Sequence, residues 1–131
     1  IMANPNIVAV ANIQGESLGF NLAANVTTTL FTVKAEVVLK VNRIQCANVD
    51  GTNAANLDLL VTKTNFTPAG VDNFTTSGSF YLAKTISIPA DATLVVLDTP
   101  IYLMEGDILK GGTAATGDLD LIVSYEVIND A

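Results

Sequence analysis

Residues 15–19 read Gly-Glu-Ser-Leu-Gly and match G-x-S-x-G, the turn that holds the nucleophilic serine of many α/β hydrolases. A serine nucleophile needs a base, and the chain contains no histidine. A Ser-Lys pair is the other route, but no lysine lies close in sequence. The residues that follow are β-branched and do not predict a helix. The motif therefore predicts a glycine-bounded turn between two strands, with Glu16 and Ser17 exposed at its tip.

Paired carboxylates are the next candidates for chemistry, since two acids can hydrolyse a glycosidic bond. Glu105 and Asp107 flank a turn glycine, and Asp118 and Asp120 alternate onto one face at the start of a strand. Neither pair lies in an aromatic-rich stretch, and the chain has no tryptophan. Turn formation and solubility account for these acids, so we expect a protein that is not an enzyme and has no catalytic residue.

Metal ligands are equally sparse. Cys46 is the only cysteine and there is no histidine, which argues against a disulfide within the chain and against zinc. Cys46 is expected to be a small buried side chain on a strand. Calcium would need several oxygen ligands, of which Asp50, Thr52, Asn53 and Asp58 could supply some, without EF-hand spacing. We assign the chain no metal and no cofactor.

The charge balance excludes two classes of partner. Thirteen acids against six bases give a net charge of −7, and the basic residues do not cluster. Phosphate backbones and anionic membrane surfaces attract Lys and Arg clusters, so neither nucleic acid nor a membrane is expected to bind. Half of the residues are hydrophobic and only 15% are charged. Such an apolar composition predicts a homo-oligomer.

Hydrophobic alternation and turn signals divide the chain into eight to ten short strands, which predicts a single all-β domain over residues 1–131, an antiparallel, jelly-roll-like β-sandwich. Asn25 breaks one pair of strands, and Asp50-Gly51 is a strong turn signal. In the longest pattern, the apolar phase slips near Asn42, which predicts a β-bulge. The expected strands cover residues 6–13, 20–24, 27–34, 37–49, 57–64, 80–88, 94–97, 101–104, 108–110 and 119–128.

Three further expectations concern individual strands and turns. In the strand over 80–88, alternation places Phe80, Leu82, Ile86 and Ile88 on one apolar face, which Lys84 interrupts, and Pro89 ends the strand. Two segments rich in glycine, residues 105–107 and 111–118, are expected to be turns. In the last strand, the alternation from Leu119 to Val127 is expected to face the core.

Residues 64–79 are rich in Gly, Pro, Ser and Thr and are expected to form a projecting loop or hairpin. Phe66 and Phe74 make this segment the best candidate for an interaction surface, because exposed aromatic side chains often anchor interfaces. The alternative is that both rings fold back and cap one end of the sandwich.

Four stretches of the sequence carry a family resemblance: MANPNIV (2–8), NVDGTNAANLDLLV (48–61), TISIPADATLVVLDTPIYLMEGDIL (85–109) and GDLDLIVSYEVI (117–128). Together they resemble small virion-associated structural proteins of tailed, notably marine, bacteriophages, over most of the chain except residues 64–79. The resemblance implies a β-sandwich that decorates a capsid or lies in a tail or fibre. Because virion parts are commonly symmetric, a trimer is the favoured oligomer.

These observations predict a non-enzymatic virion structural protein that associates with itself and binds a phage capsid or tail. The sequence shows no signal peptide, so we expect synthesis in the host cytoplasm without secretion, with Met2 as the natural start and Ile1 as an addition. The alternative is a carbohydrate-binding module that recognises a surface glycan. Sugar platforms usually need exposed Trp or Tyr, and this chain offers only Tyr81, Tyr102 and Tyr125.

Overall fold

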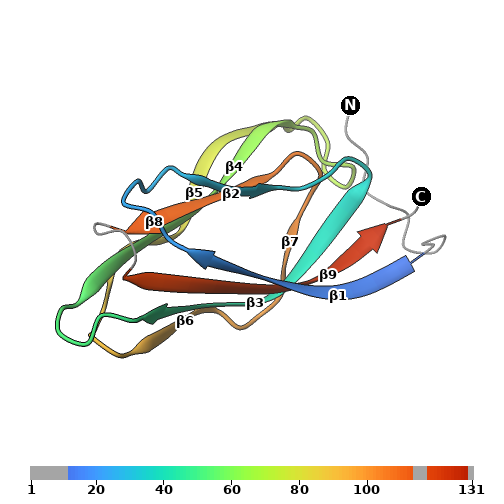
Figure 1. Ribbon diagram of the computed structural model, residues 1–131. Coiled ribbons are helices and arrows are strands. Elements are labelled where there is room, and N and C mark those ends of the chain that lie inside the picture. Colours follow the sequence, from blue (N-terminus) through green and yellow to red (C-terminus); the bar gives the residue numbers. More distant parts are fainter. Residues whose placement is uncertain (1–11, 114–117, 130–131) are drawn as a thin grey trace.

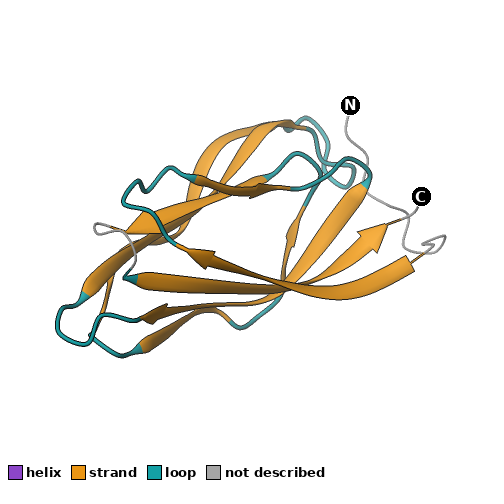
Figure 2. Ribbon diagram, in the orientation of Figure 1, coloured by secondary structure: helices purple, strands orange, loops and turns teal. Residues whose placement is uncertain are grey.

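The computed structural model describes residues 12–113 and 118–129. Those residues form nine strands joined by turns and loops, with no helix among them (Figure 2). Consequently no described helix is available that could cross a membrane. The strands are β1 (Asn12–Asn21), β2 (Thr29–Thr32), β3 (Val37–Asn48), β4 (Ala55–Phe66), β5 (Thr76–Ile88), β6 (Thr93–Leu97), β7 (Ile101–Leu103), β8 (Ile108–Thr113) and β9 (Leu119–Asn129).

The strands form two antiparallel sheets that face each other as a sandwich (Figure 1). One sheet has the order β1-β9-β3-β6, with β7 also paired to β3, and the other has the order β2-β8-β4-β5. Because β6 and β7 pair with the same strand, they act as one interrupted strand. The pairs are then nested: β1 with β9, β2 with β8, β3 with β6 and β7, and β4 with β5. This nested, two-sheet order is that of a jelly roll and confirms the predicted fold class.

The bulge in β3 was predictable from its apolar phase. Against β9, the register of β3 shifts between Val41 and Arg43, at Asn42. The shift places Val41 and Ile44 on the core face, and both are almost completely buried. Without the extra residue, Arg43 would take the next core position, and an unpaired charge in the core is costly.

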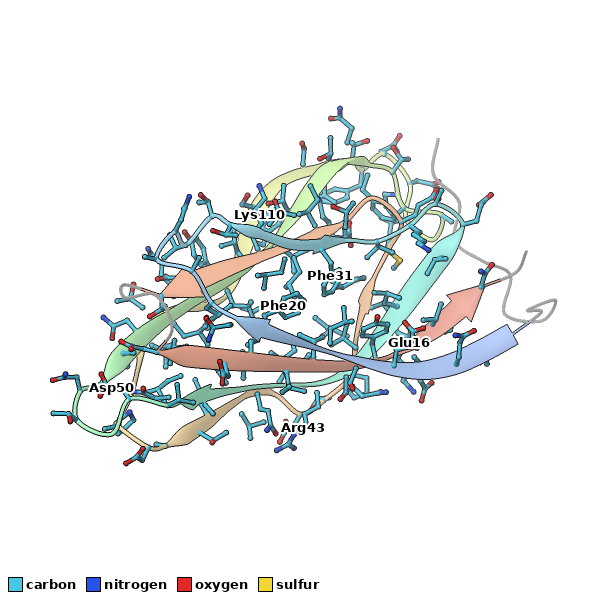
Figure 3. All side chains as sticks on the ribbon, viewed as in Figure 1. Glu16, Phe20, Phe31, Arg43, Asp50 and Lys110 are labelled. Carbon is cyan, nitrogen blue, oxygen red and sulfur yellow. The ribbon has the colours of Figure 1, made fainter. Side chains whose placement is uncertain are left out.

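Alternate residues of the long strands fill the space between the sheets, as period-2 burial requires. Leu57, Leu59 and Val61 project from β4, and Leu119, Leu121 and Val123 from β9, all with 6% exposure or less. Toward the open side between β1 and β2, Phe20 and Phe31 stack with their ring centroids 6.2 Å apart (Figure 3). Tyr125 continues this aromatic group, 6.3 Å from Phe31.

The glycine-bounded motif at residues 15–19 is not a turn, and that prediction is wrong. It lies inside β1, where Gly15 pairs with Glu126 and Gly19 with Ile122. Among the described glycines only Gly78 and Gly106 have positive φ, so neither glycine of the motif bends the chain. Most of the strand expected over residues 6–13 lies outside the described residues.

The turn signals had mixed outcomes. Asp50 accepts hydrogen bonds from the backbone N–H groups of Thr52 (2.8 Å) and Asn53 (3.2 Å), so the Asp-Gly turn is confirmed. Gly106 has φ 83°, as the turn before β8 requires. The turn expected over 111–118 was placed too early, because β8 continues to Thr113. A Cβ at Gly112 would collide with the backbone carbonyl of Asn25, so this glycine permits close packing.

The apolar face predicted for residues 80–88 is largely exposed. Phe80, Leu82 and Ile86 are 49%, 36% and 41% exposed, and only Ala83 and Ile88 of this stretch are buried. β5 is an edge strand of its sheet, and its pairing with β4 shifts register three times. Alternation identified apolar positions correctly but could not show that no strand of the opposite sheet covers them. β5 does end at Ile88, directly before Pro89, as expected.

Candidate functional site: an apolar groove between β5 and β7

An apolar groove lies between β5, an edge strand of one sheet, and β7 of the other sheet. It has a volume of about 300 Å³. Val61 and Leu103 are buried at 6% and 3% exposure, whereas Phe74, Phe80 and Tyr102 are 56%, 49% and 50% exposed. We call this feature the β5–β7 groove; its lining residues are Val61, Lys63, Phe74, Thr76, Phe80, Ile101, Tyr102 and Leu103.

The irregular course of β5 exposes one side of this groove. Phe80 pairs with Val61 and therefore shares the core-facing side of the sheet with it. Farther along, Thr85 has φ 50°, a left-handed conformation that is strained for a β-branched residue. The carboxylate of Asp58 accepts the Thr85 backbone N–H at 2.9 Å and stabilises that irregularity. β5 thus stays attached to β4 while its aromatic side chain remains accessible.

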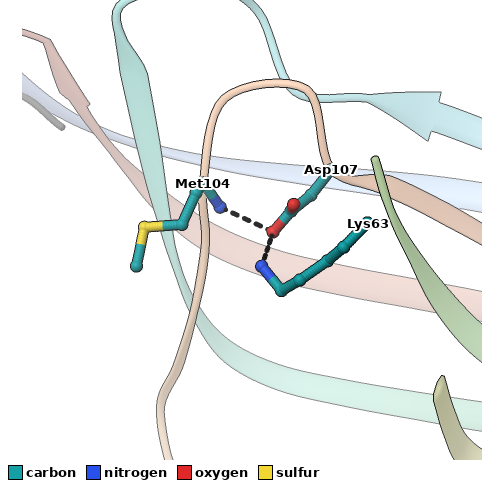
Figure 4. Close-up of polar contacts among 3 residues, drawn as sticks. All are labelled: Lys63, Met104 and Asp107. Atoms are coloured by element: carbon teal, nitrogen blue, oxygen red, sulfur yellow. Dashed lines mark hydrogen bonds and ion pairs between the residues drawn. The ribbon is translucent and has the colours of Figure 1, made fainter. Parts of the chain in front are cut away.

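The single cation of the groove lining is neutralised from within the fold. Lys63 Nζ lies 2.6 Å from Asp107 Oδ2, and the Asp107 side chain is 1% exposed. The same oxygen accepts the Met104 backbone N–H at 2.9 Å (Figure 4). Lys63 also lies 4.8 Å above the centroid of the Phe66 ring, within range of a cation–π contact. The groove is therefore apolar and close to neutral, although the chain as a whole is strongly acidic.

The two phenylalanines singled out from the sequence have different environments. Phe66 ends β4 at 7% exposure and packs back against the protein, as the capping alternative proposes. Phe74 lies in the loop between β4 and β5 and is 56% exposed. Of the two, Phe74 has the accessibility that an interface anchor needs. A partner for either residue remains a prediction.

Ser17 has neither a lysine nor a histidine in the hollow beside it. It is exposed on the outer face of its sheet and pairs with Ser124 of β9. An open hollow beside it is lined by Gly15, Glu16, Ser17, Asn42, Ser124, Tyr125 and Glu126, and this lining contains no lysine. The neighbouring Glu16 carboxylate is engaged by the Tyr125 hydroxyl, 2.9 Å away. The hollow beside Ser17 thus lacks the lysine of a Ser-Lys pair.

Three of the four paired carboxylates make contacts with neighbouring turns and strands. Glu105 accepts the backbone N–H of Glu36 at 2.6 Å, and Asp107 binds Lys63. Asp120 accepts a hydrogen bond of 2.8 Å from the side chain of Asn21. These contacts stabilise turns and strand ends.

The oxygen ligands considered for calcium do not gather either. Asp50 binds the backbone of its own turn, which holds the pKa of its carboxyl below the ordinary value. Asp58 instead lies against Thr85 of β5. Within residues 12–113 and 118–129, no group of three His, Cys, Asp or Glu side chains could hold a metal ion.

Two buried titratable groups have raised pKa values. Burial, and secondarily the charge of Asp120, raises the pKa of the Cys46 thiol to about 12. Burial also raises the pKa of Tyr125 to about 12, with a further contribution from the Glu16 carboxylate that accepts its hydroxyl. Neither group has the reactive form that chemistry near pH 7 would require.

Sequence patterns did not connect Phe80 with Tyr102. Phe80 belongs to the apolar face of an alternating strand, and Tyr102, considered only as a sugar platform, lies in a short apolar run where Ile101 and Leu103 face inward. The groove forms only because β4, β5 and β7 meet in space. The one available signal was the excess of apolar residues on a strand with Lys84 in its middle, a charge that often marks an edge strand.

Comparisons with known proteins give little beyond the chain itself. No protein-family pattern and no curated protein matches it. It is similar to a solved structure, the crystal structure of an infectious bursal disease virus VP2 subviral particle, with 14% sequence identity and a TM-score of 0.40. The similarity covers 90% of this chain and 33% of that one, so this chain spans about a third of its length. At this TM-score the likeness supports no conclusion about function.

Proposed function

We propose that this chain is a non-enzymatic structural protein of a virus particle, of the kind that decorates a phage capsid or tail. It binds the particle through the β5–β7 groove and associates with copies of itself. The observation that carries the proposal is the groove, where Phe74, Phe80 and Tyr102 are each about half exposed around a buried apolar floor.

Exposed aromatics around an apolar hollow are costly unless a partner covers them. Burying one such ring is worth about 1.5–3 kcal/mol when it is fully removed from water, and interface energy is concentrated in anchors of this type. Because Lys63 is already paired with Asp107, a partner can cover the groove without desolvating a free charge. The groove is therefore suited to an apolar projection on another protein.

The jelly-roll fold supports the particle role by analogy, since this architecture is frequent in viral capsid proteins. It is frequent in lectins too, which keeps the glycan-binding alternative in view. A sugar needs several hydrogen-bonding groups beside an aromatic platform, whereas the groove offers only Thr76, the Tyr102 hydroxyl and the paired Lys63. Tyr125 is buried and engaged by Glu16, so it cannot serve as a platform. Protein recognition fits this lining better.

The test uses purified particles of the virus that encodes the chain. We expect mass spectrometry to find the protein in them, and the purified chain to bind particles assembled without it. The double substitution Phe74→Ala and Phe80→Ala should weaken that binding at least tenfold. Ile122→Ala, which shortens a 41% exposed side chain on the outer face of the other sheet, should leave it unchanged.

Absence of the protein from purified particles would rule out the particle role. Particle binding that survives the groove substitutions would assign it to another surface. A glycan-array signal that requires Tyr102, without particle binding, would favour the carbohydrate module instead.

A further inference from the structure

The two sheets have four edges, and the strands at three of these edges have features that discourage pairing with another strand. β2 is four residues long. β5 has three register shifts, positive φ at Gly78 and Thr85, and the charged Lys84. The edge formed by β6 and β7 is interrupted at residues 98–100, which include Pro100. Short, bulged, charged and interrupted strands are the usual protection of a sheet edge.

β1 lacks most of this protection. It is ten residues long and pairs with β9 without a register shift from Asn12 to Asn21. It contains no proline, and its only charged residue is Glu16. β9 is its one partner among the described strands, and β1 lies at the edge of its sheet (Figure 1). Within the described residues, the backbone N–H and C=O groups on the other side of β1 therefore have no strand partner.

We propose that β1 pairs antiparallel with β1 of a second copy of this chain, so that the larger sheet continues across a two-fold axis. A two-fold contact is closed after two copies. The inference therefore replaces the trimer expected from virion symmetry with a dimer. It specifies the self-association of the proposed function by naming the strand that mediates it, and the pairing needs no particle.

The residue pattern selects one register for this pairing. Residues that oppose each other across a sheet share a face, and Gly15, Ser17 and Gly19 all lie on the outer face. A two-fold axis between the strands must therefore lie where one residue is directly opposite the same residue of the second copy, and not between two residues. Centring on Ser17 pairs residues 13–21 almost over the full strand, with Gly15 opposite the second copy's Gly19. Centring on Glu16 would place two carboxylates directly opposite each other, which is destabilising.

Glu16 is an inward-facing charge, the one feature of β1 that would oppose pairing. Its carboxylate already accepts hydrogen bonds from Tyr125 (2.9 Å) and Gln14 (3.2 Å). In the register centred on Ser17 it lies opposite Leu18 of the second copy, not opposite another Glu16. The charge therefore selects this register and does not prevent the contact.

Cysteine substitution tests the register directly. Ser17→Cys places two thiols opposite each other across the axis, at the Cα separation of about 5 Å that a disulfide accepts. Gly15→Cys is the matched control, because its two thiols would lie four residues out of register, roughly 13 Å apart. Nothing lies within 4 Å of a Cβ built on Gly15, so the fold accepts that side chain. The buried Cys46 contributes no background reaction.

Under mild oxidation of the full chain, we expect Ser17→Cys to form a covalent dimer at least tenfold faster than Gly15→Cys. The double substitution Gly15→Cys and Gly19→Cys should restore cross-linking. Sedimentation of the unsubstituted chain should show a concentration-dependent dimer. A monomer at every concentration together with no cross-link at residue 17 would overturn the inference, and so would preferential cross-linking at residue 15. Particle binding and the groove substitutions are measured separately, so either proposal can fail without the other.

Discussion

Three carboxylates from stretches that the sequence offered as candidates for catalysis or metal binding, Glu16, Asp58 and Asp107, each make a hydrogen bond or ion pair with another strand. Glu16 of β1 accepts the hydroxyl of Tyr125 on β9. Asp58 of β4 accepts a backbone N–H of β5, and Asp107 before β8 binds Lys63 of β4. At the scale of single residues, these three carboxylates therefore have structural contacts that link neighbouring strands and turns.

The hydrogen bond between Tyr125 and Glu16 should make the free energy of unfolding depend on pH. Its pKa is raised from 10 to about 12, so the folded state favours the neutral phenol more than the unfolded state does. The corresponding stability is fully present below pH 10 and is lost as the pH rises through about 12. Tyr125→Phe should remove this alkaline loss, which is on the order of 2 kcal/mol. Urea unfolding between pH 8 and pH 11.5 measures it.

Tyr102→Phe is the matched control, because this tyrosine is 50% exposed. It should retain the alkaline loss in full. Absorbance at 295 nm should also show one late-titrating phenol in the unsubstituted chain and none in Tyr125→Phe. An identical pH profile for the two substitutions would contradict the role of Tyr125.

Sequence patterns predicted those elements whose signals are local. The phase slip at Asn42 located the β3 bulge, because burial forces every apolar residue of that strand onto one face. The Asp50-Gly51 turn followed from side-chain hydrogen bonds within four residues. The exposure of β5 could not be predicted, because it depends on where the opposite sheet ends. The prediction of a turn at residues 15–19 was wrong because glycine is common in turns. Here pairing with β9 keeps both glycines in an extended strand.

The candidate groove was half predictable for the same reason. Phe74 belongs to a loop whose composition marked it as a surface feature. Phe80 and Tyr102 are brought to it by β5 and β7, which are not adjacent in sequence and whose meeting depends on the complete topology. No pattern of period two contains that information.

The Lys63–Asp107 contact joins β4 to the turn before β8 and tests how elements are held together. Asp107→Ala should cost about 3 kcal/mol, since it leaves the Lys63 ammonium and the Met104 N–H without their acceptor. Lys63→Met combined with Asp107→Leu should recover the part of this loss that comes from the unpaired ammonium, while the Met104 N–H still lacks its acceptor. Urea unfolding midpoints measure all three chains.

Asp98→Ala is the control for that experiment, because it removes an exposed acid from a turn. It should change the unfolding free energy by less than about 0.5 kcal/mol. Equal losses for the substitutions at residues 98 and 107 would show that the buried pair adds nothing specific.

At the scale of the molecule, the two proposed contacts lie on opposite sides of the sandwich. β1 and β2 are the first strands of their sheets, and β5 and β6 are the last. A second copy on β1 therefore leaves the β5–β7 groove open. A dimer could bind a particle through two grooves at once, which raises the apparent affinity through effective concentration without any new contact.

The net charge of the whole molecule makes a final prediction about that dimer. Each copy carries −7, so two copies repel each other before β1 meets β1. The repulsion acts over roughly 30 Å at 0.01 M salt and about 8 Å at 0.15 M. We therefore expect the dimer dissociation constant, measured by sedimentation equilibrium, to fall several-fold between those salt concentrations. Glu16→Gln, which removes the charge nearest the proposed axis, should lower the constant at low salt and flatten its salt dependence. Ion pairs across an interface would produce the opposite trend, so an association that weakens with salt would show that the copies meet through another surface.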